Sequence, residues 1–148
     1  MLTVKDLVVY YGKITALQGI SFQVPDQSIV TLIGANGAGK TTTLMAISGM
    51  VEVQSGSILL DDWDITDCQS STIVQMGVCH VPEGRHVFPQ LSVYENLLAG
   101  TIPCKKLAKG ELEARIEEQF ALFPRLKERY HQAAGTMSGG EQQMLAIS

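Results

Sequence analysis

The sequence predicts an α/β fold with an antiparallel β subdomain near its start and an inserted helical subdomain. The prediction begins from residues 28–33, an apolar run that indicates a buried strand. Residues 34–41 then match the pattern G-x-x-x-x-G-K-[ST], and residues 42–48 have a helical pattern that ends at Gly49. A strand, a glycine-rich loop and a helix in this order are the context that the pattern requires.

The composition is that of one globular domain. The chain has 148 residues, of which 45% are hydrophobic and 18% charged, so it can form a core. Its net charge of −4 argues against nucleic acid as a partner. Cys68, Cys79 and Cys104 are scattered without a C-x-x-C pair, which favours free thiols in a reducing compartment. We expect no transmembrane helix, because no apolar run approaches about 18 residues. We expect no signal peptide, because the charge pair Lys5 and Asp6 interrupts the start of the sequence.

The glycine-rich loop has the chemistry of a phosphate-binding site. Gly34, Gly37 and Gly39 allow the backbone to approach a ligand, and successive N–H groups can form a nest for an anion. Lys40 is expected to reach the β- and γ-phosphates of a nucleotide, and the Thr41 hydroxyl to bind Mg²⁺. The predicted nucleotide-binding residues of the loop are Gly34, Ala35, Asn36, Gly37, Ala38, Gly39, Lys40, Thr41 and Thr42. A glycine-rich turn before an ordinary helix is the alternative.

Two strands are expected before the loop. Residues 2–10 and 20–24 are rich in β-branched and aromatic side chains, and a turn at residues 25–27 follows them. Their closeness in sequence predicts an antiparallel sheet. Tyr11, at the end of the first strand, could stack on adenine, or it could be a half-buried strand tyrosine. The local pattern favours neither.

The middle of the chain alternates short elements. We expect a strand at residues 57–60, a short helix at 73–76 and a buried strand at 78–81, with the single tryptophan, Trp63, packed in the interior. Glu83 follows the last of these strands, at the end where α/β sheets place ligand-binding residues. Glu83 is therefore a candidate water or metal contact, although the local pattern alone favours a solvated loop carboxylate.

Two helices are expected in the segment from residue 84 to 135. Ser92 and Glu95 form a capping box that opens a helix to about residue 99. A longer helix is expected over residues 107–123, which Pro124 ends. Its apolar stripe, which is more typical of a core than of a partner surface, is Leu112, Ile116, Phe120 and Phe123. Basic residues expected on a solvated face are Lys105, Lys106 and Lys109. His80, His86 and His131 show no metal-ligand spacing.

A second unusual helix start lies near the end of the sequence. Ser138 and Glu141 form a capping box, and Gly139 and Gly140 occupy the first two helical positions. Glycine costs about 1 kcal/mol in a helix interior, so two glycines here are odd for stability alone. Bare N–H groups at a helix start can bind phosphate. A simple capped helix is the alternative, which the local pattern slightly favours.

Together these residues resemble the ATP-binding subunits of ABC transporters. The resemblance covers all 148 residues, and its most specific part is Met137-Ser138-Gly139-Gly140-Glu141-Gln142, which is similar to the family signature L-S-G-G-Q or L-S-G-G-E. It implies a P-loop NTPase core of the ABC type, with ATP and Mg²⁺ as cofactors. It also implies that Tyr11, Glu83 and Ser138 are functional, with Ser138, Gly139, Gly140 and Glu141 at the nucleotide and Thr41 and Glu83 at the metal.

The resemblance also implies partners. In the family, two ATP-binding subunits sandwich two ATP molecules head to tail, and the signature residues of one subunit bind the γ-phosphate held by the other. The inserted helices dock on transmembrane permease subunits, which work with a periplasmic or extracellular substrate-binding protein. We therefore expect a peripheral protein at the cytoplasmic face of the cell membrane that hydrolyses ATP to drive transport.

A narrower resemblance points to the F-type ATP-binding subunit of branched-chain amino acid importers. It rests on residues 10–14, 81–85 and 122–126. Most of the superfamily, including the similar urea-transport subunits, has glutamine at the position of Glu83, so the carboxylate favours the branched-chain group. A urea or amide importer remains the alternative.

The sequence departs from the family pattern at its end. The Walker B aspartate, the catalytic glutamate and the switch histidine would follow Ser148, and they are not in this sequence. The expected arrangement is a partial ABC domain, with an α/β core at residues 1–83, a helical subdomain at 84–135 and the signature at 136–148. We expect this chain alone to be unstable and slow in ATP hydrolysis, because phosphoryl transfer needs a fixed metal and a positioned nucleophile. The alternatives are a nucleotide-binding module without catalysis and a non-functional fragment.

Overall fold

A computed structural model describes residues 1–102 and 110–148. Contacts between residues divide the chain into two compact units, Met1–His80 and Val81–Ser148. The first unit holds the β-sheet and two helices, and the second holds helices only among its described residues. The functional division expected at residues 83 and 135 stays a prediction.

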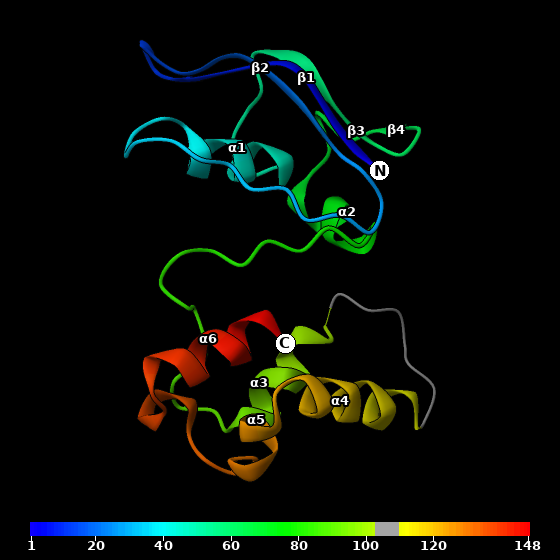
Figure 1. Ribbon diagram of the computed structural model, residues 1–148, viewed down its shortest axis with the longest axis vertical. Helices are drawn as coiled ribbons and strands as arrows, with labels where there is room; N and C mark the ends of the chain where they lie inside the picture. The colour runs from blue at the N-terminus through cyan, green and yellow to red at the C-terminus, as the bar shows by residue number, and fades with distance from the viewer. Residues whose placement is uncertain (103–109) are drawn as a thin grey trace. The chain divides into compact units, whose positions relative to one another are not determined.

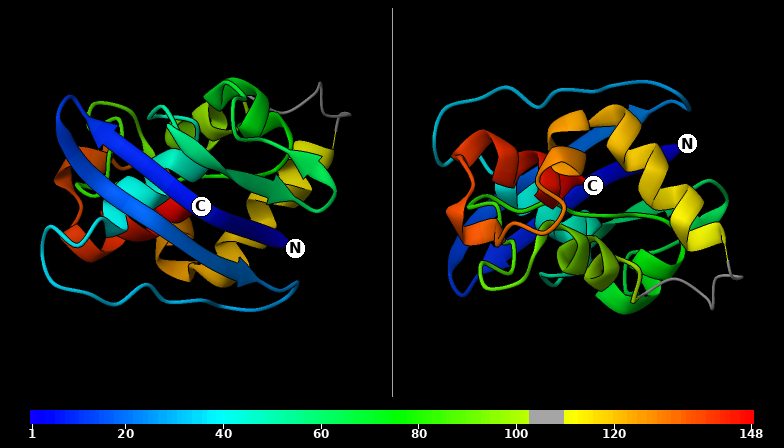
Figure 2. Two further views of the ribbon diagram at one scale, coloured as in Figure 1. Left: turned by 90° about the horizontal axis from the view of Figure 1, so that it is seen from above. Right: turned by 90° about the horizontal axis from the view of Figure 1, so that it is seen from below.

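The first unit is built on an antiparallel sheet in the order β2-β1-β3-β4 (Figure 1). Its strands are β1 (Leu2–Tyr11), β2 (Ile14–Val24), β3 (Ser55–Leu60) and β4 (Trp63–Asp64). The long central strand β1 pairs with β2 on one side and with β3 on the other. Figure 2 shows these three strands as a twisted sheet seen face on. The predicted antiparallel strands are confirmed, and β2 begins six residues earlier than expected, at Ile14 rather than Ile20.

Two helices complete the first unit, α1 (Lys40–Ile47) and α2 (Ser70–Gln75). Both helices were expected within a few residues of these bounds. The core of the unit lies between them and the sheet and contains Val4, Leu7, Val9, Leu17, Ala46, Ile47, Ile58, Ile65 and Ile73. Strand β1 supplies three of these side chains, Val4, Leu7 and Val9. Leu7 and Val9 alternate as a strand requires, and an irregularity in the register between Val4 and Leu7 shifts the alternation by one residue. The core therefore holds α1, and with it the end of the glycine-rich loop, against the sheet.

Two strand predictions are wrong. Residues 28–33 and 78–81 form no strand, and neither run pairs with another in the part of the chain that the structure describes. Ile29 is 97% exposed and Ile33 is 93% exposed, so the first run is not buried either. A strand needs a neighbour that accepts and donates its backbone hydrogen bonds, and an apolar run cannot supply that neighbour itself.

The expectation for Trp63 is also wrong. Its side chain is 71% exposed rather than packed in the interior. It stands at the start of β4, a strand of two residues that follows the turn at Asp61 and pairs with Leu60 and Leu59 of β3. A side chain on so short an edge strand has few neighbours that could cover it.

The second unit contains α3 (Val93–Gly100), α4 (Glu111–Leu122), α5 (Pro124–Glu128), a 3₁₀ turn η1 (Ala134–Thr136) and α6 (Gly139–Ile147). Ser92 caps α3 through the predicted capping box with Glu95. Helix α4 ends at Leu122, and Pro124 opens α5, because proline lacks the N–H that a helix interior needs but fits its first turn. The predicted start of this helix at residue 107 and the three lysines at 105, 106 and 109 lie outside the described residues, as does Cys104.

The helices of the second unit share one core. Its buried side chains are Val93, Leu97, Ile116, Phe120, Leu126, Ala134, Met137 and Leu145. Of the predicted stripe on α4, Ile116 and Phe120 are buried, and Leu112 and Phe123 pack against the cluster from its edge. Leu145 of α6 belongs to the same core, so the signature helix is held by the helical unit.

Candidate functional site

The glycine-rich loop ends directly in a helix whose first turn is open. Gly39 is the N-cap of α1 and has φ 86° and ψ 5°, which is left-handed backbone. No side chain caps α1, and no acidic residue lies in its first turn. The first N–H groups of an α-helix have no partner within the helix, and they carry the positive end of its dipole. This helix start can therefore accept an anion without displacing a side chain.

Close packing explains why glycine stands at position 39. A Cβ atom built on Gly39 would lie 2.5 Å from Cδ2 of Leu17 and 2.9 Å from the carbonyl oxygen of Ala16. At Gly39 the loop therefore packs directly against β2, with no room for a side chain. Strand β2 pairs with β1, so the sheet fixes the position of this end of the loop.

Lys40 is folded back over the loop. Its Nζ atom donates to the carbonyl oxygens of Gly34 at 2.9 Å and Ala35 at 2.8 Å. An ammonium group has three N–H donors, so these two bonds fix its position and leave one donor for a ligand. The cation is thereby held at the mouth of the loop before any ligand arrives.

The three threonines after Lys40 have different environments. Thr41 is exposed at the start of α1, and Thr42 is half-buried. The next residue, Thr43, is buried, and its Oγ1 donates to the carbonyl oxygen of Gly39 at 2.9 Å, so it stabilises the first turn. Thr41 is therefore the most exposed of the three residues.

The remaining candidates lie apart in the sequence. Tyr11 ends β1 opposite Ile14 and is 46% exposed, so its ring is open to stacking. Glu83 is exposed and belongs to the second unit, whereas Thr41 belongs to the first. In residues 1–102 and 110–148 no three acidic, histidine or cysteine side chains gather into a metal-binding group. A joint Mg²⁺ site of Thr41 and Glu83 therefore stays a proposal based on the resemblance.

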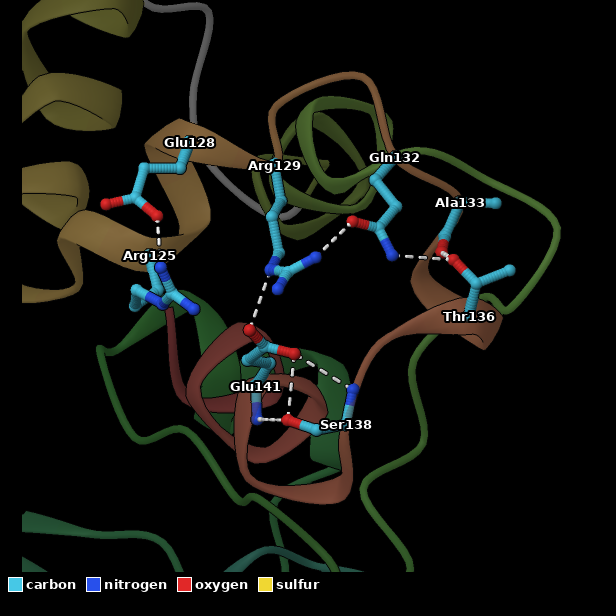
Figure 3. A network of polar contacts seen from close by, with 8 residues as sticks. All are labelled: Arg125, Glu128, Arg129, Gln132, Ala133, Thr136, Ser138 and Glu141. Carbon is cyan, nitrogen blue, oxygen red and sulfur yellow. Dashed lines mark hydrogen bonds and ion pairs between the residues drawn. The ribbon is translucent and has the colours of Figure 1, made fainter.

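The signature residues form the predicted capping box at the start of α6 (Figure 3). Ser138 is the N-cap, and its Oγ accepts from the Glu141 N–H at 3.3 Å. In return, Oε2 of Glu141 accepts from the Ser138 N–H at 2.9 Å and from its hydroxyl at 2.8 Å. Gly139 and Gly140 are the first two helical residues, as expected, and add no side chain of their own to the helix start.

Glu141 is held ionised by its neighbours. The hydrogen bonds from the hydroxyl and the N–H of Ser138 lower the pKa of its carboxyl group below the ordinary value of 4.5, and the charge of Arg129 lowers it further. Arg129 Nε lies 2.7 Å from Glu141 Oε1, the carboxylate oxygen that does not contact Ser138. Each carboxylate oxygen therefore has its own positive or donating partner.

The sequence did not indicate Arg129 or Arg85. Arg129 lies 12 positions before Glu141, and no short motif joins two residues at that distance. Arg85 lies in a loop where Gly84, Arg85 and His86 all have positive φ, and its guanidinium group is 2.8 Å from where a Cβ of Gly139 would be. Only the folded chain brings either arginine to the signature residues.

Comparisons with known proteins show the family to which the chain is similar. A family described as ABC transporter matches residues 17–148. The chain is 50% identical over 147 residues to the high-affinity branched-chain amino acid transport ATP-binding protein BraG of Pseudomonas aeruginosa, covering 99% of this chain and 62% of that protein. It is 34% identical over 148 residues to a probable branched-chain amino acid transport ATP-binding protein, LivF, of Archaeoglobus fulgidus, covering 100% of this chain and 61% of that protein.

Solved structures agree with the fold. A structure of an ATP-binding subunit of an ABC transporter matches with a TM-score of 0.85 and 30% identity, over 99% of this chain and 60% of that one. The chain therefore spans about 61–62% of the length of the two curated relatives. No helix in the described part of the chain is long and apolar enough to cross a membrane.

Proposed function

This chain belongs to the ABC transporter family, and we propose that it forms the nucleotide-binding part of an ATP-hydrolysing subunit that energises import of branched-chain amino acids. The observation that carries the proposal is the loop that ends at α1. There an uncapped helix start, a left-handed glycine and an ammonium group fixed over the loop combine in one place. The names of the two curated relatives support branched-chain amino acids as the substrate class.

In the proposed reaction the loop binds the phosphates of ATP. The N–H groups of residues 34–42 surround the phosphate oxygens, and Lys40 places its charge between the β- and γ-phosphates. The exposed hydroxyl of Thr41 would hold Mg²⁺, with Glu83 as a second candidate contact. The metal, when bound, would supply neutralisation of the charge on the phosphate oxygens, and the Tyr11 ring would stack on the adenine.

We further propose that the signature completes the site of a second subunit. The start of α6, with Ser138, Gly139, Gly140 and Glu141, offers bare N–H groups and a hydroxyl to a γ-phosphate bound in a partner subunit. Two subunits in a head-to-tail arrangement would then enclose two ATP molecules. The subunit would lie at the cytoplasmic face of the membrane, bound to permease subunits that receive the amino acid from a substrate-binding protein.

Nucleotide binding by Lys40→Met tests the proposal. Lys40→Met removes the fixed ammonium group, whereas Lys5→Met removes one exposed charge from β1 and serves as the matched control. Titration with a fluorescent ATP analogue and Mg²⁺ should show saturable binding to the parent chain and to Lys5→Met. We expect Lys40→Met to bind at least about tenfold more weakly, since hydrogen bonds to charged groups contribute about 1.5–3 kcal/mol.

Circular dichroism distinguishes lost binding from lost folding. The Lys40→Met chain should retain the spectrum of the parent, because the Lys40 ammonium group donates to carbonyl oxygens of the loop and not to the sheet or its core. Equal binding by the parent and by Lys40→Met, or a folded parent that does not bind MgATP, would contradict the proposed function.

A further inference from the structure

A connected set of side chains surrounds the start of α6. The Glu141 network, as we name it, consists of Arg129, Gln132, Thr136, Ser138 and Glu141 (Figure 3). We infer that Arg129 is a positioning residue for the signature serine, and that it acts through Glu141. The inference rests on the proposed function, in which Ser138 meets a γ-phosphate.

The first step is that Glu141 sets the direction of the Ser138 hydroxyl. One carboxylate oxygen, Oε2, accepts from both the backbone N–H and the Oγ of Ser138, at 2.9 Å and 2.8 Å. The Oγ accepts in turn from the Glu141 N–H at 3.3 Å. Two of these contacts involve the hydroxyl itself, and the third ties the carboxylate to the Ser138 backbone. The single hydrogen of the hydroxyl points at Oε2, so the position of the carboxylate sets the direction in which the hydroxyl donates.

The second step is that Arg129 holds and neutralises this carboxylate. The ion pair joins Arg129 Nε to Glu141 Oε1 at 2.7 Å, and the side chains are 33% and 12% exposed. An ion pair with so little solvent contact is screened less than a surface pair. Without the Arg129 guanidinium group, the Glu141 carboxylate would lose its ion-pair partner beside the helix start that is proposed to receive an anionic phosphate. The Arg85 guanidinium group beside Gly139 would then be the remaining cation at this helix start.

The third step is that Arg129 is itself fixed. Its Nη1 donates to Gln132 Oε1 at 2.7 Å, and Gln132 Nε2 donates to Thr136 Oγ1 at 2.8 Å. The Thr136 hydroxyl donates to the Ala133 carbonyl oxygen at 2.8 Å, within the segment that leads into the signature. The series of contacts therefore begins at Glu141 and ends at Ala133, so the Arg129 side chain is already ordered. Little of its conformational entropy is lost when a ligand binds.

Arg125 provides a matched control. It lies in α5, four residues before Arg129, and pairs with Glu128 at 2.5 Å, with both side chains 57% exposed. Figure 3 shows this pair beside the network, with no contact drawn between the two. Replacing Arg125 or Arg129 by methionine removes the same charge and a similar length of side chain, but only Arg129→Met disconnects Glu141.

The experiment combines two readouts on four variants of the chain. Arg125→Met, Arg129→Met, Glu141→Gln and Arg129→Met/Glu141→Gln are compared for MgATP binding and for MgATP-dependent self-association by sedimentation velocity. We expect Arg129→Met to bind MgATP as the parent does but to self-associate at least about tenfold more weakly, because a carboxylate without its ion-pair partner then lies where the γ-phosphate of the other subunit is proposed to bind. Arg125→Met should match the parent.

The double variant separates positioning from general stability. Glu141→Gln removes the unpaired charge, so Arg129→Met/Glu141→Gln should recover to within about threefold of Glu141→Gln alone, because the coupling between contacting residues is then absent. A purely structural role of Arg129 would show no such recovery. Equal self-association of Arg129→Met and the parent would overturn the inference.

The parent chain could fail to bind MgATP or to self-associate, and either result would count against the proposed function but not against the role of Arg129. A third measurement then tests the role of Arg129 without a ligand. Carbon NMR measures the pKa of the Glu141 carboxyl group. Hydrogen exchange measures how well the Glu141 backbone N–H, which donates to Ser138 Oγ, is protected from solvent. Arg129→Met should raise the pKa of Glu141 toward its ordinary value and speed the exchange of its amide at least about tenfold, because the cap loosens. No change in either quantity would overturn the inference.

Discussion

Gly39→Ala should destabilise the first unit more than the same change two residues earlier. Gly39 and Gly37 both have left-handed backbone, with φ of 86° and 84°. They differ in the space around them. A Cβ at Gly39 meets Leu17 and the carbonyl oxygen of Ala16, whereas a Cβ at Gly37 meets nothing within 4 Å.

The two substitutions therefore share one cost and differ in another. Left-handed backbone costs an alanine about 1–2 kcal/mol, and this applies at both positions. Only Gly39→Ala forces atoms apart, and overpacking of this kind costs about 1–3 kcal/mol. The contact at 2.9 Å is with backbone, so it cannot be relieved by rotating Leu17 alone. We expect a loss of about 2–5 kcal/mol for Gly39→Ala and about 1–2 kcal/mol for Gly37→Ala.

Amide hydrogen exchange in α1 and β2 measures this difference. Both variants lower the entropy of the unfolded chain equally, so that contribution cancels when the two are compared. The opening free energy of α1 should fall by about 1–3 kcal/mol more in Gly39→Ala than in Gly37→Ala. Equal losses in the two variants would refute the reasoning, because the contact with β2 would then have no energetic effect.

Three further predictions follow from the site and the second core. Because hydrogen bonds from its N-cap serine lower the pKa of Glu141, its contribution to stability is full above pH 4.5 and is lost as the pH falls through the lowered pKa. Urea unfolding at about pH 3 to 7 should show a shallower acid slope for Glu141→Gln than for the parent, and identical slopes would exclude this contribution. Leu126→Ala, at a fully buried position, should cost about 2–5 kcal/mol of unfolding free energy. The same change at Leu122, which is 68% exposed, should cost about 0.5 kcal/mol or less, and equal losses would refute the assigned core. Tyr11→Ala should weaken binding of an ATP analogue by about 1–3 kcal/mol. Tyr10 is equally exposed but lies on the opposite face of β1, so Tyr10→Ala should leave binding unchanged. Equal losses of affinity in the two variants would argue against stacking by Tyr11.

Local interactions were the most predictable part of this protein. The capping boxes at Ser92 and Ser138 were both expected from the spacing S-x-x-E, and both form. A capping box is closed by residues three positions apart, so the sequence contains the whole interaction. The glycine-rich loop likewise carries its own chemistry, because its donors come from consecutive backbone groups.

Elements that depend on distant partners were predictable only in part. The apolar runs at 28–33 and 78–81 have the composition of buried strands, yet neither pairs in the described part of the chain. A strand is stabilised by hydrogen bonds to a neighbour, and composition says nothing about whether that neighbour is in place. The prediction that Trp63 is buried was wrong for the same reason, because burial depends on the surrounding residues and not on the residue type alone.

The sequence by itself determined the family, the loop at Gly34–Thr41 and the signature at Ser138–Glu141, because each of these is a short run whose residues act together. The tertiary structure alone decided that Lys40 folds back on the loop carbonyls and that β2 leaves no room beside Gly39. It alone brought Arg129 to Glu141 across 12 positions of sequence. The physical reason is the same throughout: a motif specifies which groups are available, and packing between distant segments fixes the direction in which those groups point.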